Sequence, residues 1–182
     1  MENALALIEF NTVSSGIRAL DRVVKSAEVE LLAANPVCPG KYMIIFHGQL
    51  SSVKEATENA VKAEPEHVVD SMLLGNPSDS LLSALYGTTV ESEGKSVGVI
   101  ETYSGASAVL ASDAAVKAAN VSLAEIRLSR GMCGKSYALF NGSVADVEAA
   151  IETAKASVAE NSALADFAVI ANPDVKTREF LT

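Results

Sequence analysis

The stretch Ile8–Leu31, IEFNTVSSGIRALDRVVKSAEVEL, recurs 92 residues later as Ile100–Leu123, IETYSGASAVLASDAAVKAANVSL. Both stretches begin with Ile-Glu and carry an Asp and a Lys four residues apart in their second half. The identities continue at an offset of 94 residues, where Gly40-Lys41 recurs as Gly134-Lys135. A period of about half the chain indicates a tandem duplication of one domain rather than a solenoid of short repeats.

Each copy is predicted to contain a strand, a helix, two strands, a second helix and a last strand. Short apolar runs predict strands at residues 4–10, 29–33, 41–47 and 68–74 in the first copy, and at 96–102, 121–128, 135–141 and 167–171 in the second. Helical spacing relates Val13, Ile17, Leu20 and Val24 in the first copy and Ala108, Ala111, Ala115 and Ala118 in the second. An Asn-Pro pair breaks the last strand of each copy, at Asn76-Pro77 and Asn172-Pro173.

Capping-box spacing predicts where the second helix of each copy begins. Ser52 with Glu55 and Ser143 with Asp146 predict helices at about residues 53–62 and 144–158. The resulting βαββαβ order is ferredoxin-like, with a mostly antiparallel four-stranded sheet that carries its helices on one face. We therefore predict an α/β protein of the α+β type, built as a tandem duplication.

The two domains are expected at residues 1–88 and 95–182. Residues 86–95, YGTTVESEGK, are rich in Gly and polar residues and are interpreted as the linker between them.

The charge balance excludes two classes of partner. The chain has 182 residues, with 14 basic and 23 acidic side chains and a formal net charge of -9. Such a chain repels both a phosphate backbone and an anionic bilayer. The N-terminus lacks the basic region of a signal peptide, and no apolar run approaches the roughly 20 residues that cross a membrane. We therefore expect a cytoplasmic protein whose partners are neither nucleic acid nor membrane.

Recognisable catalytic motifs are missing from the sequence, which has no Gly-rich phosphate loop, nucleophile elbow, His-Glu-x-x-His or Cys-x-x-Cys. His47 and His67 are interpreted as surface or strand-end residues. Glu9 and Glu101 occupy one register of the first strand in both copies, and a duplicated carboxylate could be an acid/base pair. The favoured interpretation is that each accepts hydrogen bonds from a neighbouring backbone or subunit. The chain is therefore predicted not to be an enzyme.

The turns before the third strand of each copy contain the two cysteines. The first turn reads NPVCPGK over residues 35–41 and the second reads SRGMCGK over residues 129–135, so Cys38 aligns with Met132 and Cys133 with Pro39. Either thiol could be a buried, inert group. One thiolate is a poor metal site, because iron-sulfur clusters and structural zinc use three or four ligands. On a three-fold axis, however, a trimer would bring three copies of Cys38 together.

Two acid-base pairs occupy the same place on the first helix of each copy. Asp21 with Lys25 and Asp113 with Lys117 have i,i+4 spacing with the acid N-terminal to the base, which favours pairing on a helix. Each pair is either a simple exposed ion pair or a marker of a subunit edge.

These features together resemble the bacterial microcompartment shell domain. The resemblance rests on a strand ending Ile-Glu, Asp-x-x-x-Lys-Ala before the second strand, a Gly-Lys turn, a strand ending at Gly and a terminal Asn-Pro. Two such domains in one chain resemble the tandem-domain, trimeric shell proteins. The turn Cys38-Pro39-Gly40-Lys41 is similar to the cluster-binding turn of the iron-sulfur shell proteins of propanediol-utilisation microcompartments.

The resemblance implies a homotrimer that forms a flat pseudohexameric disc and packs edge to edge with other shell proteins, in the shell of a cytoplasmic microcompartment. By the same resemblance, Lys25 and Lys117 are shell-edge contacts, and Cys38 ligates a 4Fe-4S cluster, one per trimer on the three-fold axis, with Cys133 as a further candidate ligand. The implied role is electron transfer or cluster traffic across the shell, with a lumenal redox enzyme as a further partner. The implied pore-loop residues are Pro39, Gly40, Met132 and Gly134.

Two other functions remain open at this stage. One is a shell tile whose open pore passes metabolites and which holds no cluster. The other is a ferredoxin-like sensor or enzyme in which the duplicated domains bind a small molecule.

Overall fold

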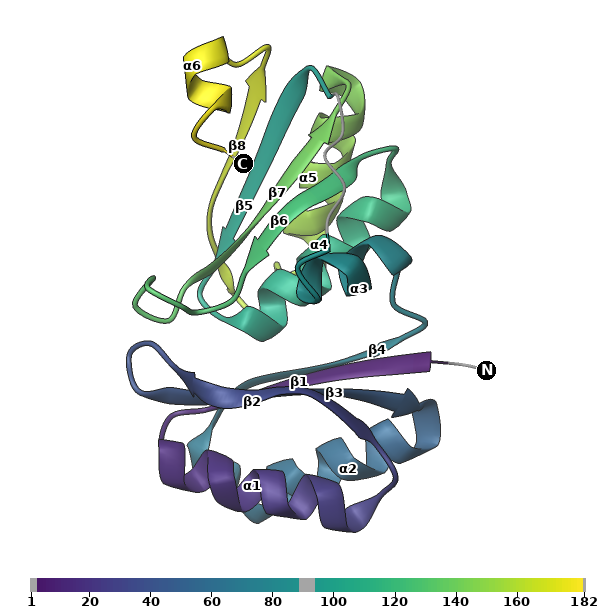
Figure 1. Cartoon of the computed structure of the whole chain (residues 1–182), viewed down its shortest axis with the longest axis vertical. Coiled ribbons are helices and arrows are strands. Elements are labelled where there is room, and N and C mark those ends of the chain that lie inside the picture. Colours follow the sequence, from purple (N-terminus) through teal and green to yellow (C-terminus); the bar gives the residue numbers. More distant parts are fainter. Residues whose placement is uncertain (1–2, 89–93, 182) are drawn as a thin grey trace. The chain divides into compact units, whose positions relative to one another are not determined.

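The computed structural model describes residues 3–88 and 94–181. Contacts within the chain divide it into two compact units (Figure 1). The first unit comprises Met1–Pro77 together with Ser104–Ala106 and Ser129–Gly134, and the second comprises Ser78–Tyr103, Ser107–Leu128 and Lys135–Thr182. The predicted linker at residues 86–95 includes 89–93, which lie outside the described residues. Among the described residues, no helix is long and apolar enough to cross a membrane.

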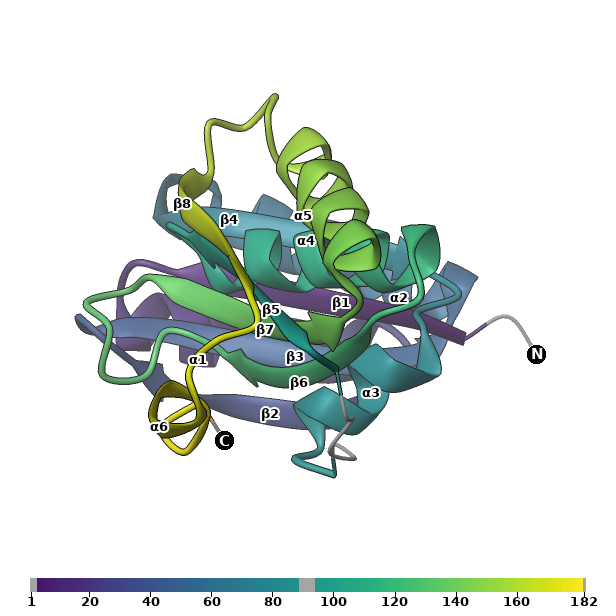
Figure 2. The same cartoon turned by 90° about the horizontal axis from the view of Figure 1, so that it is seen from above.

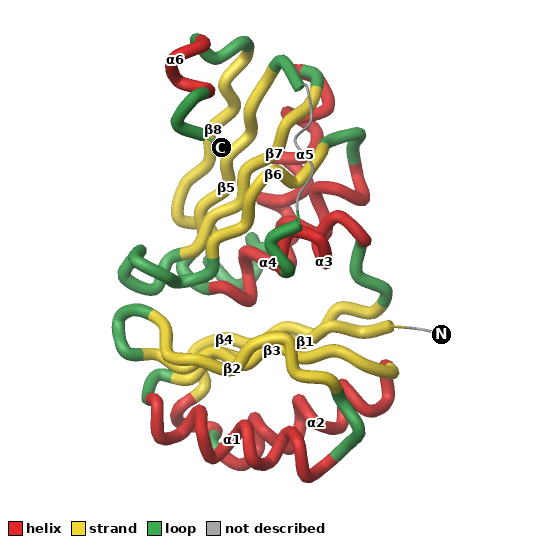
Figure 3. Tube along the Cα trace, viewed as in Figure 1, coloured by secondary structure: helices red, strands yellow, loops and turns green. Residues whose placement is uncertain are grey.

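Both repeats have the predicted ferredoxin-like arrangement. The first repeat runs β1 (Asn3–Phe10), α1 (Val13–Ser26), β2 (Glu30–Val37), β3 (Lys41–Gln49), α2 (Leu50–Ala63), a 3-10 turn (Pro65–His67) and β4 (Val68–Gly75). The second runs β5 (Ser96–Thr102), α4 (Gly105–Ala118), β6 (Ser122–Arg127), β7 (Ser136–Gly142), α5 (Val144–Ser157) and β8 (Leu164–Ala171). The antiparallel sheets have the orders β2-β3-β1-β4 and β6-β7-β5-β8 (Figure 3).

A short helix, which the sequence analysis did not predict, follows the last strand of each repeat. These helices are α3 (Asp79–Leu85) and α6 (Val175–Arg178). Figure 2 shows β8 running alongside β5, with α6 after it at the end of the chain. Both helices begin at a polar side chain, since Ser78 accepts a hydrogen bond from the backbone of Leu81 and Asp174 accepts one from Lys176.

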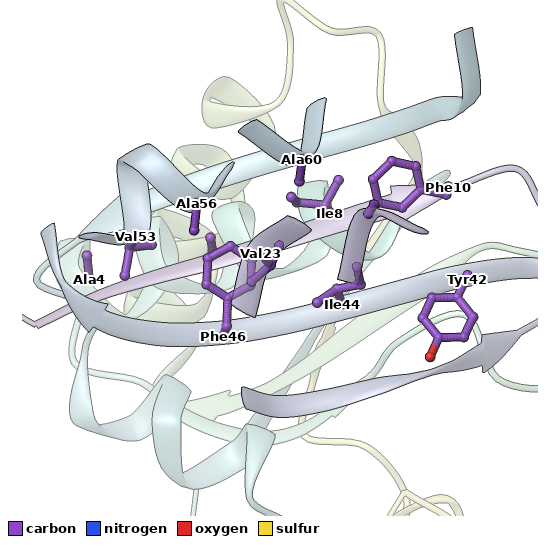
Figure 4. Close-up of a cluster of buried hydrophobic side chains, with 12 residues drawn as sticks. Ala4, Ile8, Phe10, Val23, Tyr42, Ile44, Phe46, Val53, Ala56 and Ala60 are labelled. Carbon is purple, nitrogen blue, oxygen red and sulfur yellow. The ribbon is translucent and has the colours of Figure 1, made fainter. Parts of the chain in front are cut away.

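The first sheet and its two helices enclose an apolar core (Figure 4). Alternate residues of β1 enter it, which is the two-residue period of a strand with one face on the helices. Its fully buried members from the strands and helices include Ala4, Ala6, Ile8, Phe10, Ala19, Val23, Ile44, Phe46, Val53, Ala56 and Ala60. The many alanines let the helices lie close to the sheet.

Helix α1 turns small side chains rather than large ones toward the sheet. Its buried residues are Ser15, Gly16, Ala19 and Val23. A Cβ added at Gly16 would lie 2.3 Å from the Tyr42 side chain, so the helix packs where only glycine fits. Of the apolar positions whose spacing predicted the helix, Val13, Ile17 and Val24 are therefore left exposed, and Leu20 packs partly buried against the core.

The predicted helix starts are partly right. Ser143 caps α5, because its Oγ accepts the backbone N–H of Asp146 at 3.2 Å, so this prediction is confirmed. The Ser52 cap is wrong, because α2 begins at Leu50 directly after β3 and has Gln49 at its N-cap with no side-chain hydrogen bond. Strand β8 begins at Leu164, three residues before the predicted start.

Candidate functional site

The first cysteine lies on a tight turn between β2 and β3. The Gly40 N–H donates to the Val37 carbonyl at 2.9 Å and closes the turn, with Cys38 and Pro39 between them. Cys38, Pro39 and Gly40 are all exposed. Gly40 has a φ of 105°, which glycine adopts without a steric penalty.

The second cysteine turn belongs to the first compact unit and is hydrogen-bonded to the first turn. The Cys38 N–H donates to the Ser129 carbonyl at 3.1 Å. Cys133 is exposed in a left-handed backbone conformation, Met132 is half-buried and Gly134 is buried. The structure therefore brings together the two turns that the sequence analysis related by repeat symmetry.

Lys41 joins both turns to the end of β1. Its Nζ lies 2.8 Å from a carboxylate oxygen of Glu9 and 3.3 Å from the Gly134 carbonyl oxygen. Glu9 is fully buried, and its other oxygen accepts the N–H of Gly105, the first residue of α4. The first N–H groups of a helix have no hydrogen-bond partner within the helix. A buried carboxylate at this end supplies an acceptor for such an N–H and gains a hydrogen bond that stabilises its own charge. The interpretation of Glu9 as a hydrogen-bond acceptor is confirmed.

Glu101 holds the corresponding position on β5. Its carboxylate forms an ion pair with Lys135, the counterpart of Lys41, and a quarter of its side chain is exposed. The hydrogen bond to Glu101 raises the pKa of Lys135. Lys41 and Lys135 were not predicted as site residues, although the duplicated Gly-Lys was the signal that could have identified them.

Among the glycines of the two turns, Gly134 has the least space for a side chain. Its φ is 90°, and a Cβ there would lie 3.1 Å from Pro39 Cδ and 3.2 Å from Lys41 Cε. We expect Gly134→Ala to lower the free energy of unfolding by about 1–2 kcal/mol through backbone strain and crowding. Gly131, which also has positive φ but has nothing within 4 Å of the added Cβ, is the matched control for strain alone. Urea denaturation of both variants checks this, and equal losses would contradict a role for the crowding.

The remaining predicted residues have partners close to them in the chain or on a neighbouring element. Lys25 pairs with Asp21 at 2.7 Å on α1 and Lys117 pairs with Asp113 at 2.5 Å on α4, which confirms both predicted i,i+4 pairs. His47 Nε2 is 3.5 Å from Glu30 Oε2, and His67 Nδ1 is 2.9 Å from Asn11 Oδ1. Over residues 3–88 and 94–181, no three His, Cys, Asp or Glu side chains of one chain could together hold a metal ion.

Comparisons with known proteins identify the same duplication. The BMC domain model matches the chain twice, over residues 4–77 and 96–173. The bacterial microcompartment shell protein PduT of Citrobacter freundii is 34% identical over 173 residues, 95% of this chain and 94% of that protein.

Two solved structures share the fold. A crystal structure of a microcompartment protein from Desulfitobacterium hafniense DCB has a TM-score of 0.87 and 34% identity, with 98% of this chain and 99% of that chain covered. The fused permuted hexameric shell protein MSM0275 of the RMM microcompartment has a TM-score of 0.68 and 25% identity, with 88% and 85% covered.

Proposed function

Since the chain belongs to the BMC-domain family of bacterial microcompartment shell proteins, we propose that three copies close into a pseudohexameric tile with every Cys38 turn at its three-fold axis. The tile is a structural subunit of the microcompartment shell. Its function is to enclose the compartment and, through a cluster shared by the three copies, to pass electrons or the cluster itself across the shell. The observation that carries the proposal is the exposed Cys38 turn within a duplicated shell domain.

Repeat symmetry supports closure of a ring. Within the first unit, Gly105 at the start of α4 donates its N–H to buried Glu9. Each repeat also contains the counterpart of the other group. Val13, which starts α1 of the first repeat, corresponds to Gly105, and Glu101 of the second repeat, whose side chain is a quarter exposed, corresponds to Glu9. If the Val13 N–H of one copy donates a hydrogen bond to Glu101 of the next copy, the contact is head-to-tail and can close a ring. Six equivalent domains then come from three chains.

The thiols suit an iron-sulfur cluster once copies are combined. Thiolates are the usual ligands of such clusters, and three Cys38 side chains leave one iron of a 4Fe-4S cluster for a ligand other than cysteine. Exposure of Cys38 on a hydrogen-bonded turn leaves its sulfur accessible to a shared cluster. A bound cluster would take up and release one electron at a time, and a redox enzyme inside the compartment is the expected partner.

Tiling is tested through the α1 ion pair. We expect Lys25→Ala to abolish extended sheets in negative-stain electron micrographs, because a lysine at a tile edge contacts the neighbouring tile. Its matched control is Lys62→Ala, since Lys62 is also exposed and paired at i,i+4, with Glu58. Light scattering should show trimers for both variants. Sheets that persist in Lys25→Ala would contradict the edge role of Lys25.

A further inference from the structure

In the second unit, the segment that follows the first repeat is held against α4 and β6. The backbone N–H of Ser78 donates to Asp113 Oδ1 at 2.8 Å, and α3 packs against β6 (Figure 3). Leu81 of α3 is fully buried, and Leu123 of β6 is only 3% exposed. The second repeat thus has a surface on α4 and β6 that the segment after the preceding repeat covers.

The equivalent surface of the first repeat, on α1 and β2, is exposed. Its members, which we name the α1–β2 flank, are Ile17, Asp21, Val24 and Leu31. Leu31, the counterpart of Leu123, is 43% exposed, and Ile17 and Val24 are about half exposed. The Asp21 side chain is 55% exposed whereas that of Asp113 is 5% exposed, although both pair with a lysine in the same way.

The C-terminal segment is the second repeat's counterpart of the segment that contains α3. Asn76 and Asn172 both have left-handed backbone conformations, with φ of 54° and 49°, and both precede proline. The chain therefore leaves β4 and β8 in the same local conformation. Beyond Asn172, Val175 is 71% exposed and Phe180 is 87% exposed, which is unusual for large apolar side chains on a single chain.

We propose that the C-terminal segment of one copy, Asp174–Leu181, docks on the α1–β2 flank of a second copy. The segment after the first repeat docks on the second repeat of the same chain. In the proposed ring, the repeat next to the second repeat is the first repeat of another copy, so the C-terminal segment would dock there. Asp174 then donates its N–H to Asp21 as Ser78 does to Asp113, and Phe180, at the position of Ala84, covers Leu31. This inference rests on the proposed trimer, because only neighbouring copies in a ring present the flank to the segment.

Photocrosslinking tests the contact directly. Benzoylphenylalanine replaces Phe180, and the protein is assembled from a mixture of nitrogen-15-labelled and unlabelled chains. Mass spectrometry is expected to find crosslinks from position 180 to residues 17–31 that join a labelled to an unlabelled chain. Crosslinks that stay within one chain, or that reach only other surfaces, would overturn the docking.

A binding measurement provides the second test. Phe180→Ser should raise the dissociation constant of the trimer at least tenfold, because it removes the burial of a large apolar side chain. The control is Val144→Ser, since Val144 and its counterpart Leu50 are equally exposed, at 37% and 36%, and thus give no sign of a copy-specific cover. An unchanged dissociation constant for Phe180→Ser overturns the docking alone, whereas a wild-type chain that remains monomeric overturns the proposed tile as well.

Discussion

Replacing Cys38 with serine is expected to abolish the brown colour that we predict for the wild-type chain after anaerobic incubation with iron and sulfide, and the electron paramagnetic resonance signal that we predict after reduction. The reason is the ligand count. In the proposed trimer each chain contributes one Cys38, so the substitution would remove all three thiolate ligands of the shared cluster at once, and a serine hydroxyl is a poor substitute for a thiolate. We expect the loss to be complete, and the trimer to remain intact by light scattering, because Cys38 is exposed and its structural hydrogen bond uses the backbone N–H.

Cys133→Ser is the matched control for this experiment. Cys133 is also exposed and lies on the adjoining turn, so it experiences the same reagents and any non-specific iron binding. A cluster that survives in Cys133→Ser and is lost in Cys38→Ser assigns the ligand to Cys38. A colourless wild-type trimer, indistinguishable from the Cys38→Ser variant, would contradict the cluster and leave a tile with an open pore.

Alanine in place of Glu9 is expected to act mainly on folding, and alanine in place of Glu101 mainly on assembly. Glu9→Ala leaves Lys41 and the Gly105 N–H without their partner in a buried position, so we expect it to lower the free energy of unfolding by about 3–5 kcal/mol. Glu101 is partly exposed, so Glu101→Ala should lower it by about 1 kcal/mol or less. If Glu101 accepts a hydrogen bond from the N-terminal N–H of a helix in the next copy, its removal should also raise the dissociation constant of the trimer about tenfold.

Two measurements separate the two carboxylates. Urea denaturation reports the stability of each chain, and sedimentation at a series of concentrations reports the dissociation constant of the trimer. Because the two carboxylates occupy one register of equivalent strands, each variant is the control for the other. A Glu101→Ala variant that assembles normally would contradict the proposed contact between copies.

Much of the fold could be predicted because the sequence repeats the same pattern in two copies, so each copy checks the elements predicted from the other. The first strand, the first helix and the order of elements along the chain agree between the copies, and their predicted positions match the structure closely. The Ser52 cap failed because β3 runs directly into α2, whose first residue, Leu50, comes before Ser52. The α1 core face could not be predicted from apolar spacing, because close approach to Tyr42 selects Gly16 and other small residues.

The site was only partly visible in the sequence. The two cysteine turns could be aligned, but the hydrogen bond from Cys38 to Ser129 and the bridge from Lys41 to Gly134 depend on tertiary contacts about 90 residues apart in the chain. The exposed apolar residues of α1 and of the C-terminal segment likewise have no signal in one sequence, because spacing alone does not distinguish a core face from an interface.

Native mass spectrometry of the anaerobically reconstituted wild-type protein tests the central claim most directly, because one spectrum reports both the number of chains and the bound iron and sulfide. The account predicts a dominant species of three chains with a single 4Fe-4S cluster. A species with one cluster for each chain, or clusters on monomers, would contradict a cluster shared by three Cys38 residues at the axis of a tile.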